Sequence, residues 1–125
     1  MTATAQPPAW TRVGSLGAFK AARQLACRID DLELLLLRVG GDVMVLHNYC
    51  THLGKPLTGG RVMAGHITCP FHGACFDVKT GAAVSGPAVF PLHRFPARLE
   101  GDDVVADLSR RPLNPAAGFG NIREK

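Results

Sequence analysis

Residues 48–77, NYCTHLGKPLTGGRVMAGHITCPFHGACFD, place two cysteines and two histidines in short pairs. One residue separates Cys50 from His52, two separate Cys69 from His72, and sixteen lie between the pairs. Glycine and proline follow the first pair closely and border the second, so we expect each pair on a loop. Together the loops offer two thiolates and two imidazoles, which are ligands for a soft or borderline metal.

Zinc is the first alternative, because structural zinc sites use four nitrogen or sulfur ligands. Common zinc modules pair cysteine with cysteine at one end and often histidine with histidine at the other. Here each pair is mixed. The two cysteines could instead share one metal and the two histidines a second metal. That is the ligand set of a [2Fe–2S] centre in which two histidines replace two cysteines on one iron.

The two pairs and their surroundings resemble the ligand boxes of the Rieske family. The boxes are Cys50-Thr-His52-Leu-Gly and Cys69-Pro-Phe-His72-Gly, and the similarity covers most of residues 10–108. The resemblance implies one [2Fe–2S] cluster per chain, held by Cys50, His52, Cys69 and His72. It also implies that the free edges of the two imidazoles form the electron exit.

Four further positions separate the branches of this family. High-potential members place a hydroxyl donor two and four residues after the second histidine, where this chain has Ala74 and Phe76. They also bridge the two boxes by a disulfide, at positions that here are Lys55 and Phe71. These departures indicate the low-potential, ferredoxin-like branch. Backbone N–H groups would then remain as donors to the cluster sulfurs, at residues 53, 54, 73 and 74.

The rest of the chain predicts short strands separated by turns, without a sustained helical period. This pattern is typical of an all-β sandwich or barrel. A Gly40-Gly41-Asp42 turn predicts a hairpin whose second strand leads to Cys50. A second hairpin should return the chain to Cys69. We expect strands over residues 10–13, 23–29, 32–39, 42–47, 61–64, 66–68, 75–78, 82–84, 92–99 and 104–108, with Pro96 at an edge or a bulge.

Three segments are expected along the chain. Residues 1–9 predict a flexible leader, residues 10–108 the Rieske domain, and residues 109–125 a tail rich in Arg, Pro and Gly. The resemblance implies a small antiparallel β barrel with an inserted cluster-binding subdomain at about residues 46–87. Cys27 and Cys75 are expected as buried thiols rather than ligands, and His47 is close enough to the first box to touch its surroundings.

Composition restricts the partners. The 125-residue chain carries a formal charge of +4, but its basic residues are scattered, which disfavours nucleic acid. We find no secretory signal, and the longest apolar run, Leu34 to Leu37, is too short to span a membrane. We therefore expect a soluble, cytoplasmic protein with reduced cysteines. Carrier ferredoxins of oxygenase systems are often acidic. The basic charge of this chain departs from that pattern and does not identify the charge of the partner's surface.

The resemblance predicts a one-electron carrier like the small ferredoxin of bacterial ring-hydroxylating oxygenase systems. Such a carrier takes electrons from an NAD(P)H-dependent flavoprotein reductase and passes them to a terminal oxygenase. The sequence offers no flavin, nicotinamide or mononuclear iron site, so we do not expect a complete enzyme. Two alternatives stay open. One is a Rieske component fixed in a larger reductase, such as the nitrite reductase small subunit or a Rieske domain beside a flavoprotein module. The other is a zinc-stapled structural module.

Overall fold

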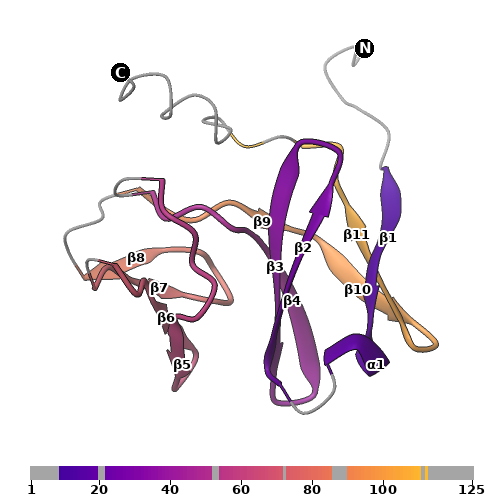
Figure 1. Cartoon of the computed structure of the whole chain (residues 1–125), viewed down its shortest axis with the longest axis horizontal. Helices are drawn as coiled ribbons and strands as arrows, with labels where there is room; N and C mark the ends of the chain where they lie inside the picture. Colours follow the sequence, from indigo (N-terminus) through magenta and orange to yellow (C-terminus); the bar gives the residue numbers. More distant parts are fainter. Residues whose placement is uncertain are drawn as a thin grey trace.

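The strands of the computed structural model form three antiparallel sheets (Figure 1). The structure describes residues 9–19, 22–51, 54–71, 73–85, 90–110 and 112. The first sheet has the order β1-β11-β10, the central sheet β2-β3-β4-β9, and the small sheet β5-β6-β7-β8. The strands of the first two sheets are β1 (Trp10–Ser15), β2 (Gln24–Ile29), β3 (Leu32–Val39), β4 (Asp42–His47), β9 (Arg94–Phe95), β10 (Ala97–Glu100) and β11 (Asp103–Asp107).

The small sheet lies beside the central sheet, on the side away from β1, β10 and β11 (Figure 1). Its strands are β5 (Arg61–Met63), β6 (His66–Thr68), β7 (Cys75–Asp77) and β8 (Ala83–Ser85). The β5–β6 hairpin turns at Ala64 and Gly65, which both have positive φ angles of 53° and 80°. Such a pair of left-handed residues matches the natural twist of a two-residue hairpin. One short helix, α1 (Leu16–Phe19), follows β1.

The β3–β4 hairpin separates two hydrophobic cores, one on each of its faces. Leu34 and Leu36 pack into a core shared with the first sheet, which includes Val13 and Val104. Leu35 and Leu37 alternate with them and pack into a second core, shared with the small sheet. Successive side chains of a strand point to opposite faces, so the continuous apolar run is a strand buried on both sides.

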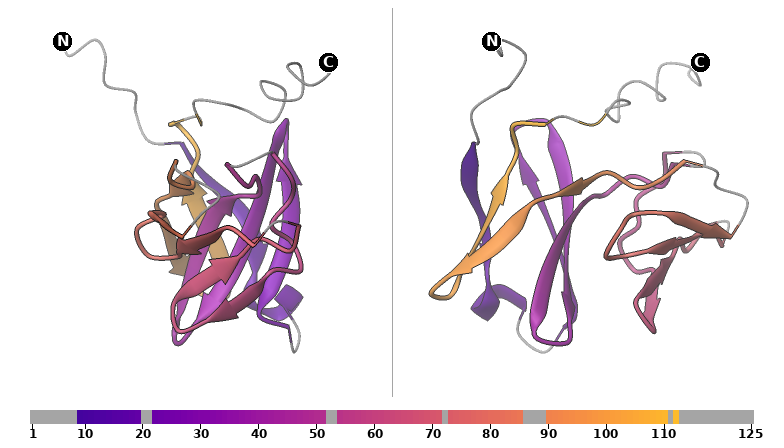
Figure 2. Two further views of the ribbon diagram at one scale, coloured as in Figure 1. Left: turned by 90° about the vertical axis from the view of Figure 1, so that its left-hand side faces the viewer. Right: turned by 180° about the vertical axis from the view of Figure 1, so that it is seen from behind.

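The expected all-β, antiparallel architecture is confirmed, with two corrections. The expected strand over residues 92–99 is wrong, because Pro96 divides it. β9 pairs with β4 in the central sheet, whereas β10 pairs with β11 in the first sheet (Figure 2). Proline has no N–H to donate to a ladder, so it suits the place where the chain changes sheets. Within the described residues the sheets stay separate, as an open sandwich with a third sheet attached, and no barrel closes.

The other expected elements are found within one or two residues of their predicted bounds. The central hairpin pairs Val39 with Asp42 across Gly40, whose φ is +63°. No helix of the described residues is long and apolar enough to cross a membrane. Residues 1–8 and 113–125 lie outside the described residues, so the flexible leader and most of the tail stay predictions. The first of the described residues, Ala9, donates its N–H to the carboxylate of Asp107 at 2.9 Å.

Candidate metal centre

The first ligand loop begins at Cys50, three residues after β4 ends. The Cys50 N–H donates to the carbonyl of Lys55 at 2.8 Å, and the Gly54 N–H donates back to the carbonyl of Cys50 at 2.7 Å. Gly54 has a φ of +77°, a conformation that glycine adopts without steric cost. These two bonds join Cys50 to Gly54 and Lys55; His52, between them in sequence, lies outside the described residues.

The second ligand loop repeats the same closure. The Cys69 N–H donates to the carbonyl of Ala74 at 2.7 Å, and the Gly73 N–H donates to the carbonyl of Cys69 at 3.1 Å. Gly73 has a φ of +79°, within two degrees of its counterpart. His72 also lies outside the described residues. Each loop is therefore built on a cysteine bonded to the residues four and five positions later, although the cysteine–histidine spacing differs by one.

The two loops bring Cys50 and Cys69 into one buried cluster. Their side chains keep 1% and 2% of their surface exposed and belong to the core between the central and small sheets. All four cysteines are thiols rather than disulfides, as expected. Two buried thiols at the ends of matching loops fit the sulfur half of a mixed sulfur and nitrogen centre. The imidazole half is assigned only by the sequence.

The expected role of the loop amides changes at Gly54 and Gly73. The sequence suggested that their N–H groups would donate to cluster sulfurs. In the structure both donate to the carbonyl of the preceding cysteine, so they close the loops. A Cβ at Gly73 would meet no other heavy atom within 4 Å, so crowding does not explain the glycine. The positive φ of Gly73 is what favours it. At Gly54 a Cβ would also approach the Tyr49 ring to 3.1 Å.

Side chains that sequence reasoning missed fix the first loop on the central sheet. The Asn48 carboxamide oxygen accepts the Leu57 N–H at 2.7 Å, and its nitrogen donates to the Thr58 hydroxyl at 2.7 Å. The Gln24 carboxamide donates to the Gly60 carbonyl at 2.6 Å and accepts the Gly59 N–H at 2.9 Å. The only signal for these contacts was the Asn and Gln residue type, because the partners of Gln24 lie about 35 residues away in sequence.

An aromatic stack lies at the entry to the first loop. The rings of His47 and Tyr49 stack with centroids 5.1 Å apart and planes inclined by 14°. His47 is buried at the end of β4, and its N–H donates to the carbonyl of His93. The expectation that His47 lies near the first box is therefore confirmed. The stack supports the backbone from which Cys50 projects.

Lys55 and Phe71 connect the two ligand loops. The Lys55 ammonium lies 5.6 Å from the centroid of the Phe71 ring, which is a cation–π distance. These are the two positions at which the resemblance implied a disulfide in high-potential relatives. In this chain the same positions face each other without a covalent bond. The contact tethers the second loop to the first and leaves both side chains accessible to water.

The structure also describes the remaining residues that the sequence singled out near the ligands and in β2. Ala74 and Phe76 are fully buried and offer no hydroxyl, as the sequence indicated. Cys75 is half-buried in β7. Cys27 is half-buried in β2, donates to the Val13 carbonyl at 3.3 Å, and has its pKa raised by burial. Cys27 packs against the core of the first sheet as expected, and both thiols are half-buried rather than buried.

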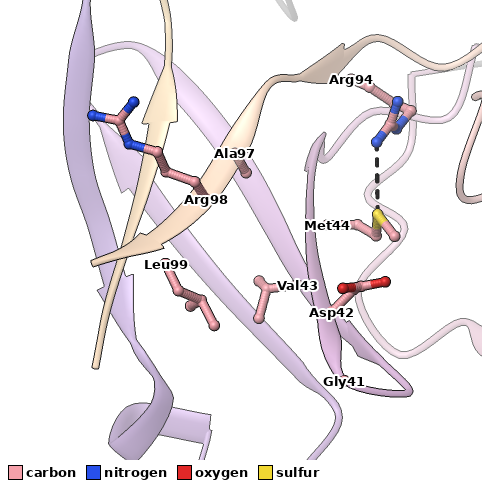
Figure 3. Close-up of a pocket in the computed structure, with 8 residues that line it drawn as sticks. All are labelled: Gly41, Asp42, Val43, Met44, Arg94, Ala97, Arg98 and Leu99. Carbon is pink, nitrogen blue, oxygen red and sulfur yellow. Dashed lines mark hydrogen bonds between the residues drawn. The ribbon is translucent and has the colours of Figure 1, made fainter. Parts of the chain in front are cut away.

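A cavity of about 310 Å³ opens elsewhere, between the β3–β4 turn and β10 (Figure 3). Arg94 reaches into it and donates to the sulfur of Met44 at 3.6 Å. Neither Cys50 nor Cys69 lines it, so it is separate from the candidate centre.

A comparison with protein families identifies residues 9–96 as a Rieske [2Fe–2S] domain. The chain is 34% identical over 100 residues to the ferredoxin component of biphenyl 2,3-dioxygenase from Rhodococcus jostii, covering 80% of this chain and 94% of that protein. It is 32% identical over 100 residues to apoptosis-inducing factor 3 of mouse. That match covers 70% of this chain but only 16% of the mouse protein.

Solved structures show the same fold. A ferredoxin of Sphingomonas yanoikuyae superposes with a TM-score of 0.73 at 32% identity, covering 83% of this chain and all of that one. A ferredoxin in complex with the oxygenase of carbazole 1,9a-dioxygenase gives 0.73 at 26% identity, covering 85% and 99%. The matched domain, the paired loops and the buried cysteines agree, and we conclude that this chain belongs to the Rieske [2Fe–2S] family and binds one [2Fe–2S] cluster.

Proposed function

We propose that this chain is a one-electron carrier that receives electrons from an NAD(P)H-dependent flavoprotein reductase and delivers them to a terminal ring-hydroxylating oxygenase. The observation that carries the proposal is the matched pair of loops at one end of an all-β framework. Relatives that this chain matches over 80% or more of their length are named as ferredoxin components of dioxygenase systems. One related ferredoxin is known in a complex with its oxygenase.

We assign Cys50, His52, Cys69 and His72 as the ligands. A Rieske cluster accepts and releases one electron at a potential above that of the all-cysteine [2Fe–2S] clusters of plant-type ferredoxins. The protein supplies the rest. The buried cysteines hold the sulfur side away from water, and the described loop residues Lys55, Phe71 and Gly73 are exposed. Exposed His edges would shorten the path to a partner, and their free nitrogens would be redox-linked proton sites.

The competing proposal is a Rieske domain that works inside a larger reductase. It is favoured by the similarity to apoptosis-inducing factor 3, of which this chain spans 16%. The matched ferredoxins, by contrast, are spanned almost completely. Size-exclusion chromatography of an extract from the source cells separates the two. A carrier elutes near the 13.3 kDa of the chain, whereas a fixed component elutes with a large complex.

Visible and EPR spectra before and after dithionite test the centre itself. The expected result is a brown protein whose reduced form gives a rhombic signal with an average g value below that of the free electron. NADH alone should leave the protein oxidised, and NADH with a flavoprotein reductase of a dioxygenase system should reduce it. A colourless protein that retains zinc would contradict the proposal and leave a metal-stapled β module.

A further inference from the structure

Two exposed phenylalanines lie beside the predicted ligands. Phe71 is 53% exposed and comes directly before His72 in the second loop. Phe90 is 64% exposed, and its carbonyl accepts a hydrogen bond of 2.7 Å from the hydroxyl of Thr51 in the first loop. Large aromatic side chains left in water are costly, and grouped ones mark interaction sites more often than scattered ones.

The two phenylalanines are connected through the first loop. Phe90 contacts it at Thr51, and Phe71 contacts it through the Lys55 ammonium. The backbone of Lys55 is in turn bonded to Cys50. We call these four residues, Thr51, Lys55, Phe71 and Phe90, the aromatic rim. The rim joins both ligand loops, so a protein bound to it would lie next to the cluster.

The rim carries the positive charge of Lys55, which takes part in none of the three ion pairs found among the described residues. Residues 48–76 contain two basic residues, Lys55 and Arg61, and no aspartate or glutamate. The first acid after them is Asp77, whose carboxylate accepts the N–H groups of Lys79 and Thr80 in its own turn. Those hydrogen bonds lower the pKa of Asp77 and keep it ionised, but hold it at the other end of β7.

We propose that the aromatic rim docks an acidic protein surface, on which a carboxylate pairs with Lys55 while Phe71 and Phe90 lose contact with water. The inference rests on the proposed carrier function and adds the chemistry of the partner. Charge complementarity guides the encounter, and burial of the aromatic rings retains the complex. A second copy of this chain fits poorly, because it would add a second basic rim to a chain that already carries +4.

Two inorganic oxidants of opposite charge test the sign of the electrostatic charge on the rim. Dithionite-reduced protein is mixed at low ionic strength with ferricyanide or with tris(phenanthroline)cobalt(III). Each reagent takes one electron from the cluster and becomes ferrocyanide or the cobalt(II) complex. We expect Lys55→Glu to slow the anionic reagent and to accelerate the cationic one, each by about two- to fivefold, as for other exposed charge pairs. Added salt should remove both effects.

Lys79→Glu is the matched control. It makes the same change in net charge, at the turn that follows the opposite end of β7. We expect its effect on both rates to be less than half that of Lys55→Glu. Equal effects of the two variants would overturn the proposal, since net charge would then govern the rates. So would unchanged rates in Lys55→Glu.

Protein oxidants test the aromatic part. The double variant Phe71→Ser/Phe90→Ser should reduce cytochrome b5, which has an acidic surface, several-fold more slowly, yet react normally with ferricyanide. Met63→Ser, at a 60% exposed side chain of β5, should change neither rate. A rate with cytochrome b5 that rises when salt is added at low ionic strength would overturn the proposal, because the two surfaces would then repel each other.

Two further results separate this inference from the function on which it rests. Protein without a reduced EPR signal would overturn the carrier function and the inference together. Protein that exchanges electrons normally, but dimerises in sedimentation velocity until Phe71 and Phe90 are replaced, would overturn the inference alone. In that case a second copy, and not an acidic partner, covers the rim.

Discussion

The central sheet differs from the small sheet in how it is held together. β3 pairs along six residues with β2 and along six with β4, and no bulge interrupts either ladder. The small sheet has strands of only three residues, and its β7–β8 pairing shifts register between Cys75 and Phe76. Short strands contribute few ladder bonds and little hydrophobic contact of their own.

The small sheet is held largely by what it packs against. Its inner residues Ile67 and Phe76 share a core with Leu35, Leu37 and the two buried cysteines. The turn after β7 is tied to the framework where the Leu92 N–H donates to the Gly81 carbonyl at 2.7 Å. The central sheet thus supports this region through one face of β3, and we expect metal ligation to supply further stability. The predictions below test this difference, from the largest expected effect to the smallest.

Replacing one buried cysteine should remove the cluster while leaving the central sheet folded. Cys69→Ser should abolish the cluster, because the alcohol is a poor iron ligand and metal binding stabilises the fold around it. Iron content and visible absorbance should fall to background, while far-ultraviolet circular dichroism keeps the β signal of the framework. Cys75→Ser is the matched control, six residues away and half-buried. Iron loss in Cys75→Ser as well would contradict the ligand assignment.

Neighbouring leucines of β3 offer a second test. Leu36→Ala and Leu37→Ala each remove a fully buried side chain and should cost about 2–5 kcal/mol in unfolding free energy. Leu36 faces the first sheet and Leu37 faces the small sheet. In a denaturant titration, Leu37→Ala should lose visible absorbance before its β signal. Leu36→Ala should lose both together. The same order in both variants would mean that the regions unfold as one unit.

A loop glycine should give a smaller effect. Gly73→Ala places a side chain at a φ of +79° and should cost about 1–2 kcal/mol, the penalty for left-handed backbone in other residues. The cost falls on the second ligand loop, so release of iron to a chelator should accelerate about tenfold. Gly41→Ala, in the open β3–β4 turn, is the control, because a Cβ there meets nothing within 4 Å and its φ is not positive. Equal release rates would mean that loop closure does not limit iron retention.

The smallest expected effect concerns pH and the framework. Burial lowers the pKa of His93 below its ordinary value of 6.5, although its Nε2 lies 2.9 Å from the Arg110 carbonyl. The unfolded chain therefore binds this proton before the folded chain does as the pH falls. Stability should decrease below about pH 6.5 and level off below the lowered pKa. Thermal unfolding from pH 8 to 5 should show a flatter profile in His93→Gln than in the parent chain. Parallel profiles would exclude this contribution.

Predictions from sequence succeeded where the signal is local. The Gly40-Gly41 turn, the Gly65 turn and the alternation within each strand lie inside short segments, so their elements were predicted nearly to the residue. Pro96 was read as an edge or a bulge of one strand, and the structure gives it a larger role. No local pattern says which sheet each half of a divided strand joins, because that depends on partners tens of residues away.

By itself the sequence determined the chemistry of this protein. Ligand type and spacing are covalent properties, so Cys50, His52, Cys69 and His72 could be proposed without coordinates. Only the tertiary structure decided how the ligand loops are supported. The Gln24 ties to residues 59 and 60, the Lys55–Phe71 contact and the two faces of β3 join segments distant in the chain. Such contacts arise from packing, which a linear pattern constrains but does not specify.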